Sequence, residues 1–222
     1  MTGNTLRTVT EKSILVLAII LAVSACESAY YSTMERFGLE KRDILIDRVK
    51  DARQSQQEAK KEFASALDQF RATVAFDGGD LEREYDKLSA AYERAEAQAE
   101  EVRDRINDVE DVGEALFREW ESELAEYSDR SLRSQSEQQL RATRRQFDST
   151  VLAMNRAAKS MDPVLAVFKD RVLYLKHNLN ARAIAALKTE NTRLQTRVDT
   201  LIREMEMAIA EADRFIASMD AG

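Results

Sequence analysis

Apolar residues recur at alternating intervals of four and three residues between residues 81 and 127. This heptad pattern is typical of a helix that buries one face against other helices. The members of the seam are Leu81, Tyr85, Leu88, Tyr92, Ala95, Ala99, Val102, Ile106, Val109, Gly113, Leu116, Trp120 and Tyr127. The pattern predicts one long helix over residues 81–127.

Two less regular seams lie on either side of this one. The earlier seam consists of Leu45, Val49, Ala52, Ala59, Phe63, Ala66 and Phe70, with polar Gln56 interrupting it. The C-terminal seam consists of Ile184, Leu187, Leu194, Val198, Leu201, Met205, Ala208 and Phe215. Asn191 falls within the C-terminal seam, and two interpretations stay open: a buried polar residue that fixes the helix register, or a half-exposed position.

Four stretches carry helix-ending or helix-starting signals. Phe76 to Asp80 contains two glycines and a capping aspartate, which predicts a tight turn between helices. Ser134 to Glu137 matches a capping box that opens a helix. Asp162–Pro163 is either a helix start or a kink. Residues 177–180 are a candidate for a further break, although neither glycine nor proline marks them. The predicted helices therefore span about 32–75, 81–127, 132–161 and 163–219, the last broken near 177–180.

The composition favours an all-α protein. The chain has one proline and six glycines in 222 residues, and the rest is rich in strong helix formers. Short connections place consecutive helices antiparallel. The sequence predicts an elongated antiparallel bundle, or coiled-coil rod, of three or four long helices that forms a single domain over residues 26–222.

The N-terminal segment has the organisation of a signal peptide. Arg7 and Lys12 precede an apolar run over residues 14–23, and small residues, including Ala25, precede Cys26. Ten residues of helix span about 15 Å, roughly half of a bilayer's hydrocarbon core. We therefore expect removal of residues 1–25 between Ala25 and Cys26. The alternatives are an uncleaved anchor and an ordinary secretory signal.

The sequence Val23-Ser24-Ala25-Cys26 resembles the signal of bacterial lipoproteins. The resemblance implies that Cys26 is acylated, with palmitate-type chains, and becomes the mature N-terminus. Glu27 stands where inner-membrane lipoproteins usually carry Asp, so the resemblance favours the outer membrane facing the periplasm. The chain would then bind the membrane through the lipid on Cys26.

The charge pattern argues against nucleic acid as a partner. The net charge is −7, and both signs are interspersed as on a solvated helical surface. The densest basic patch is Arg141, Arg144 and Arg145, which we interpret as a solvated face. Anionic lipid headgroups are the weaker alternative for that patch.

The sequence offers little chemistry beyond Cys26. His177 is the only histidine and Cys26 the only cysteine, so no metal site is predicted. The carboxylates lie in charge-laced faces at helical spacing and form no isolated catalytic pair. We predict no catalytic residue, no cofactor and no enzyme activity.

The mature chain resembles a family of bacterial lipoproteins known only as domain of unknown function 2959. The resemblance rests on Ser28–Tyr31, Lys41–Leu45, Phe76–Gly79, Glu114–Phe117 with Trp120, and Leu175–Ala181. It implies a helical envelope protein without an assigned activity. Because heptads explain Leu175–Ala181 least, we predict a partner or self-association surface there, at Leu175, His177, Asn178 and Asn180.

Three functional hypotheses follow. The first is a lipid-anchored periplasmic scaffold or interaction protein of the cell envelope, with a protein partner or self-association. The second is a carrier of a lipid or small ligand, suggested by the small and aromatic seam residues. An enzyme is the third and remotest hypothesis.

Overall fold

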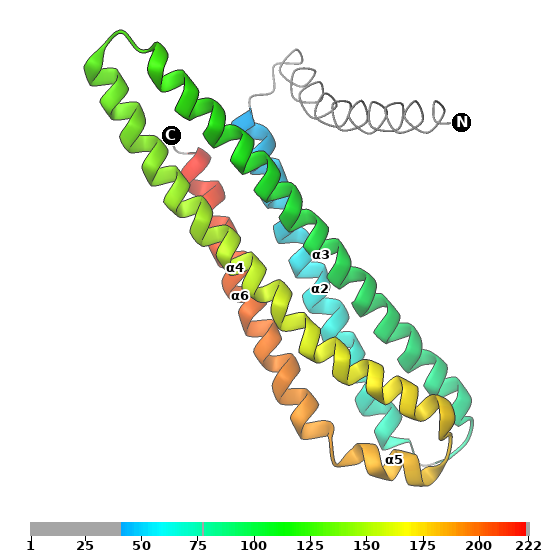
Figure 1. Cartoon of the computed structure of the whole chain (residues 1–222). Helices are drawn as coiled ribbons and strands as arrows, with labels where there is room; N and C mark the ends of the chain where they lie inside the picture. Colours follow the sequence, from blue (N-terminus) through cyan, green and yellow to red (C-terminus); the bar gives the residue numbers. More distant parts are fainter. Residues whose placement is uncertain (1–40, 77, 221–222) are drawn as a thin grey trace, which may run out of the picture. The chain divides into compact units, whose positions relative to one another are not determined.

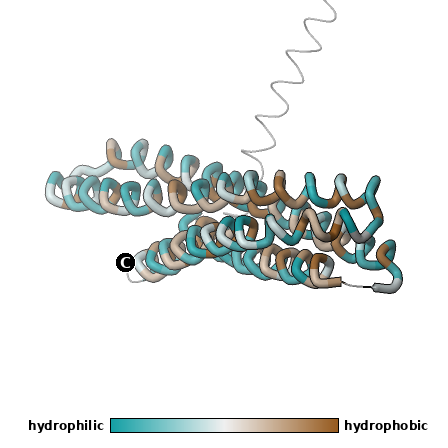
Figure 2. Tube along the Cα trace, turned by 90° about the horizontal axis from the view of Figure 1, so that it is seen from below, coloured by the Kyte–Doolittle hydropathy of each residue, from teal (hydrophilic) through white to brown (hydrophobic). Residues whose placement is uncertain are grey.

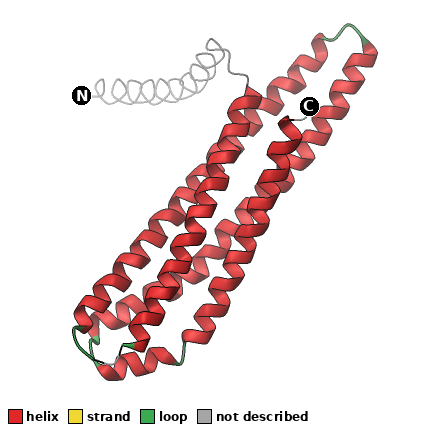
Figure 3. Cartoon of the chain, turned by 180° about the vertical axis from the view of Figure 1, so that it is seen from behind, coloured by secondary structure: helices red, strands yellow, loops and turns green. Residues whose placement is uncertain are grey.

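The computed structural model describes residues 41–76 and 78–220, which form five α-helices packed antiparallel and contain no strand (Figure 1 and Figure 3). The elements are α2 (Lys41–Ala75), α3 (Leu81–Glu123), a 3-10 turn η1 (Leu124–Glu126), α4 (Arg130–His177), α5 (Ala181–Lys188) and α6 (Asn191–Asp220). The chain divides into two compact units, Met1–Ile44 and Leu45–Gly222, and the helical bundle is the second. The all-α prediction is confirmed.

Each long helix of the bundle packs against two neighbours. Helix α4 contacts both α3 and α6. Helix α2 reaches α3 where the Gln98 amide donates to the Ser55 carbonyl at 3.4 Å. It reaches α6 where Arg53 pairs with Asp213 at 2.6 Å. This arrangement closes a four-helix bundle in which α5 is a short connecting helix.

The predicted seams form the interior of the bundle. The α2 seam is fully buried, including polar Gln56, which has no exposed surface. The α3 seam is buried from Leu88 to Val109, and the C-terminal seam is buried throughout. Hydrophilic and hydrophobic positions alternate along every helix, as expected for helices with one buried face (Figure 2).

Helix α4 continues through Pro163, so the predicted boundary between residues 161 and 163 is absent. Proline removes one backbone donor and costs about 3 kcal/mol inside a helix. Met161, Val164 and Phe168 are nevertheless buried on one face across it, while Pro163 itself is exposed. Continuous packing of the seam outweighs the local penalty, and the chain breaks after His177 instead.

Helix α4 also begins earlier than predicted. Asp129 is its N-cap, and one carboxylate oxygen accepts hydrogen bonds from two first-turn N–H groups at 2.7 and 3.1 Å. Ser134 therefore lies inside the helix. Glu137 pairs with Arg133 and Arg141 instead of closing a capping box. Asp129, and not Ser134, caps the helix because its carboxylate accepts hydrogen bonds from two otherwise unpaired N–H groups.

The turn between α2 and α3 has the predicted form. The Asp80 carboxylate caps α3 by accepting from the Arg83 N–H at 3.1 Å, and Gly79 has a φ of +104°. Glycine tolerates this left-handed conformation without steric cost. Helix α3 ends at Glu123 and tightens into η1, so it is slightly shorter than predicted. Predicted helical residues 32–40 lie outside the described residues.

The turn joining α3 to α4 stands clear of α6 (Figure 1 and Figure 3). The contact of α6 with α4 near this end includes the rings of Phe215 and Phe147, whose centroids lie 6.0 Å apart. Gln146 also donates to the Arg214 carbonyl at 3.2 Å. Beyond these contacts α3 and α4 continue together. We call residues 114–145 the tip hairpin.

Candidate functional site

The loop between α4 and α5 is shaped by two asparagines. Asn178 ends α4, since its N–H donates to the Leu175 carbonyl at 3.0 Å and its side chain donates to the Tyr174 carbonyl at 2.9 Å. Asn180 begins α5, because its side-chain oxygen accepts from the Ala183 N–H at 3.1 Å. Capping on both sides holds Leu179 between them in a defined three-residue loop.

Three large apolar side chains are exposed in this loop and in the last turns of α4, within residues 173–179. Leu173 is 47 % exposed, Tyr174 is 39 % exposed and Leu179 is 41 % exposed. We call these three residues the corner surface. Exposed apolar residues this close together along the chain are more informative than isolated ones, and tyrosine is among the side chains enriched at protein interfaces.

The four residues predicted as a partner surface lie next to the corner surface along the chain, but none of them is one of its three exposed apolar side chains. Leu175 is fully buried in the core, while His177 is exposed at the end of α4. Asn178 and Asn180 act as caps. A role of these four residues in binding a partner stays a prediction.

The sequence contains a signal for the corner surface that the prediction of a partner surface did not use. The buried positions Phe168 and Leu175 lie one heptad apart. Leu173 and Tyr174 fall just before Leu175, outside the 3-4 spacing of the seam. Large apolar residues out of phase with a buried seam point toward solvent, so their spacing alone indicates this surface.

Ion pairs fix the connection that follows the corner. Arg171 of α4 pairs with Glu190 at 3.2 Å, and Arg193 pairs with the same carboxylate at 3.5 Å. Helix α5 buries Ile184 and Leu187. These contacts attach the start of α6 to the end of α4, next to the loop between α4 and α5.

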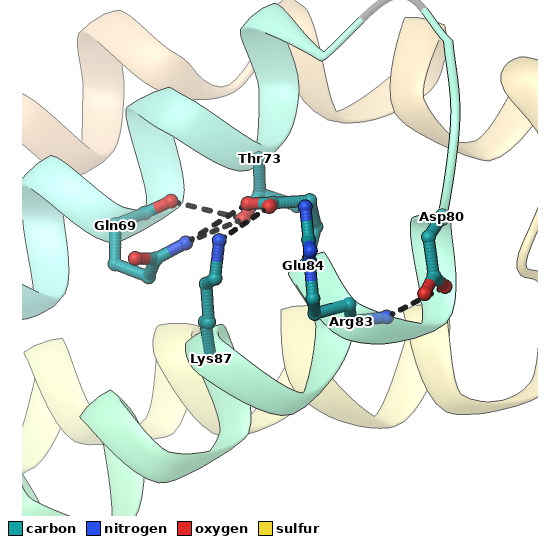
Figure 4. A network of polar contacts seen from close by, with 6 residues as sticks. All are labelled: Gln69, Thr73, Asp80, Arg83, Glu84 and Lys87. Carbon is teal, nitrogen blue, oxygen red and sulfur yellow. Dashed lines mark hydrogen bonds and ion pairs between the residues drawn. The ribbon is translucent and has the colours of Figure 1, made fainter.

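A polar network joins the ends of α2 and α3 at the turn between them (Figure 4). Glu84 is only 7 % exposed and accepts from Lys87 at 2.7 Å and from Gln69 at 3.4 Å. The hydrogen bond from Lys87 lowers the pKa of Glu84, although burial acts in the opposite direction. Thr73 completes the network by donating to the Gln69 carbonyl at 2.9 Å. The carboxylate is held as an anion and acts as a structural link between the two helices.

The buried tyrosine of the α3 seam, Tyr92, has a structural role. Tyr92 is 8 % exposed, and its hydroxyl donates to Glu96. Burial and this hydrogen bond raise the pKa of Tyr92 to about 12. The phenol therefore stays protonated and packs in the helix interface.

Among the described residues, grooves lie between neighbouring helices. One, of about 570 Å³, runs between α3 and α4 and is lined by charged and apolar residues that include Arg144, Lys159 and Leu152. A second, of about 370 Å³, lies between α4 and α6, and its lining includes the apolar residues Pro163, Val164 and Leu201. The polar part of its lining consists of Ser160, Thr196, Thr200, Arg193 and Arg197.

Residues 41–76 and 78–220 contain no cluster of three side chains suited to hold a metal ion. Among the same residues, no helix combines the length and apolar character needed to cross a membrane. The predicted lipidation and cleavage positions, Cys26 and Ala25, lie outside the described residues.

These features define a class of protein: an all-α antiparallel bundle with buried heptad seams, capped turns and an exposed apolar corner. A family model described as protein of unknown function, DUF2959, matches residues 30–219, so the chain belongs to this family. The family resemblance predicted from the sequence is confirmed. No curated protein and no solved structure matches the chain.

Proposed function

We propose that this protein is a lipid-anchored scaffold or interaction protein of the bacterial cell envelope, attached through Cys26 and facing the periplasm from the outer membrane. It acts by binding another protein, not by catalysis. The lipoprotein-like sequence Val23-Ser24-Ala25-Cys26 supports the attachment. The corner surface supports the contact function, and this observation carries the proposal.

The corner combines rigidity with exposed apolar area. Its loop is capped on both sides by Asn178 and Asn180, so little conformational entropy is lost when a partner orders it. Leu179 and Tyr174 supply side chains that gain free energy when a partner removes them from water. A preformed apolar surface of this kind suits recognition of a protein.

Metabolic labelling with a palmitate analogue tests the anchor. We expect the wild-type chain to incorporate the label and Cys26→Ser to lose it, because the chain contains no other cysteine. The matched control Ser28→Ala leaves the cysteine intact and should keep the label. Equal labelling of wild type and Cys26→Ser would overturn acylation at this residue, as would an unlabelled wild type.

Site-specific photo-crosslinking in intact cells tests the contact. A photoreactive residue in place of Leu179 should give discrete adducts with a protein. The same residue in place of Met207, which is 53 % exposed on α6, is the control and should give none. Equal adduct patterns from the two positions, or no adduct from position 179, would count against the corner as a binding surface.

The groove between α4 and α6 favours a second candidate function, carriage of a small anionic amphiphile. Its lining includes the apolar residues Val164 and Leu201, and Arg197 in the same lining has no ion-pair partner among the described residues. Native mass spectrometry of the purified chain should then show a bound fatty acid that is lost in Arg197→Glu. A chain that stays empty after incubation with long-chain fatty acid would eliminate this candidate.

A further inference from the structure

The corner surface lies in a basic segment of an acidic chain. Between residues 169 and 188 the sequence has five basic residues and one acidic residue, a net charge of +4 with histidine neutral, whereas the whole chain has a net charge of −7. The basic residues of the segment are Lys169, Arg171, Lys176, Arg182 and Lys188. A local excess of one sign attracts molecules of the opposite sign, so the charge of this segment bears on which partner the corner surface binds.

Three of these basic residues lie close to the exposed apolar residues of the corner surface along the chain. Lys169 lies four residues before Leu173 in α4, and Lys176 lies three residues after it. Residues three and four apart are neighbours on a helix surface, so Leu173 has a lysine on either side. Arg182 lies three residues after Leu179, in the first turn of α5. We call Lys169, Lys176 and Arg182 the basic rim.

The basic rim is not neutralised by carboxylates of the described residues. Its three side chains are exposed, and none of them has an ion-pair partner in residues 41–76 and 78–220. Arg171, within the same segment, differs because it pairs with Glu190 at 3.2 Å. The rim therefore leaves three positive charges for another molecule, close to side chains that gain free energy when they leave water.

We propose that the partner of the corner surface is a protein with acidic residues around an apolar centre. The three apolar side chains of the corner surface contact that centre, and carboxylates of the partner pair with the basic rim. Charges at the edge of an interface speed association and select partners by sign. The inference rests on the proposed function, because it names the chemistry of the partner that this function requires.

Asp170 distinguishes a protein partner from a membrane surface. Anionic lipid headgroups also attract lysine and arginine. Asp170, however, is exposed, has no ion-pair partner among the described residues, and lies four residues before Tyr174 on α4. A negatively charged leaflet repels a carboxylate in this position, whereas a protein can place a hydrogen-bond donor against it. This carboxylate favours a protein over a lipid surface.

Charge reversal in the basic rim tests the sign of the partner's surface. The variant carries Lys169→Glu with Lys176→Glu in a chain that has the photoreactive residue at position 179. We expect the yield of the protein adduct in intact cells to fall at least about fivefold, because two repulsive contacts replace two attractive ones. Neither lysine has an ion-pair partner among the described residues, so the fold should be retained, which circular dichroism of the purified chain checks.

Two variants control for net charge and for packing of the side chains. Lys61→Glu with Arg145→Glu makes the same change in net charge at exposed positions outside the corner that also lack an ion-pair partner among the described residues. Its adduct yield should equal that of the unchanged chain. Lys169→Arg with Lys176→Arg keeps both charges and should keep the adduct.

Two further measurements examine the adduct itself. Irradiation of isolated cell envelopes in about 1 M salt, where the Debye length is about 3 Å, should lower the adduct yield. Mass spectrometry of the adduct should place the crosslink in a partner segment with more Asp and Glu than Lys and Arg. A crosslinked segment with a basic excess would contradict the proposal.

Three other results would overturn the acidic partner. The first is an unchanged adduct yield in Lys169→Glu with Lys176→Glu, and the second is an equal fall in the Lys61→Glu with Arg145→Glu control. The third is a phospholipid in place of a protein on position 179, which would mean that lipid covers the corner. A chain that gives no adduct at position 179 removes the proposed contact function as well. An adduct that forms but ignores charge reversal removes only the acidic partner, so the two failures are distinguishable.

Discussion

Gly113 of α3 lies directly against the ring of Phe147 of α4. A Cβ atom on residue 113 would lie 2.1 Å from Cζ of that ring and 2.4 Å from Cε2. The ring also packs edge-on against Phe117, with centroids 5.3 Å apart, and against Phe215 of α6. The glycine thus lets three helices share one aromatic cluster where the bundle passes into the tip hairpin.

Replacing Gly113 by alanine should destabilise the protein even though alanine is the better helix former. The propensity gain is about 1 kcal/mol, whereas overpacking a core costs about 1–3 kcal/mol. The difference is a net loss of up to about 2 kcal/mol in the free energy of unfolding, measured in urea. Gly78→Ala is the control, because nothing lies within 4 Å of a Cβ at that position. A Gly113→Ala variant as stable as wild type would show that the Phe147 ring moves aside freely.

Pro163→Ala should stabilise the protein. The substitution restores a backbone N–H inside α4, at an exposed position, and should raise the free energy of unfolding by about 1–3 kcal/mol. Thermal unfolding followed by circular dichroism measures the change. Reduced stability would mean that packing of the proline ring contributes more than the recovered hydrogen bond.

Gln56→Met should also stabilise the protein. Gln56 is fully buried in α2, and neither atom of its side-chain amide has a hydrogen-bond partner. An unsatisfied buried polar group costs about 1–3 kcal/mol, and methionine has a similar shape without that cost. Chemical unfolding of Gln56→Met, compared with Gln54→Met at an exposed position of the same helix, measures the gain. A loss of stability specific to position 56 would contradict an unsatisfied amide in the core.

The link between Glu84 and Lys87 predicts a pH dependence of stability. Because the folded-state pKa of Glu84 lies below the ordinary value of 4.5, its contribution is fully present above pH 4.5. It disappears as the pH falls through the lowered folded-state pKa. Glu84→Gln should therefore be less stable than wild type at pH 7, by about 1 kcal/mol, with the difference vanishing in acid.

Unfolding curves collected from neutral pH down to pH 3 check this dependence. Exposed Glu82→Gln, two residues away, is the matched control. A Glu84→Gln difference that stays constant with pH would show that packing of the side chain, and not its charge, holds the two helices together.

The seams show which features of the fold heptad spacing alone predicts. Leu45, Val49 and Phe70 are fully buried at the spacing that predicted them. Asp80 caps α3 as its position before the seam indicates. These features are local: the heptad decides which face of a helix is apolar, and a capping side chain contacts N–H groups only two or three residues away.

The errors arise where local signals compete with distant packing. Pro163 is a strong local break, yet the residues on both sides of it bury one continuous face against other helices. Ser134 opens a capping box, but Asp129 caps the helix earlier. In each case the sequence contains both signals, and only the packed helix shows which one prevails.

The sequence by itself determined the helical class, the buried seams and the turn at Gly79, because these follow from composition, heptad spacing and backbone sterics within short segments. The tertiary structure decided which seam residues are covered and which remain exposed. Tyr127 and Val109 occupy the same seam, but Tyr127 is 42 % exposed whereas Val109 has no exposed surface. Burial depends on where neighbouring helices end, and that is fixed by contacts between residues far apart along the chain.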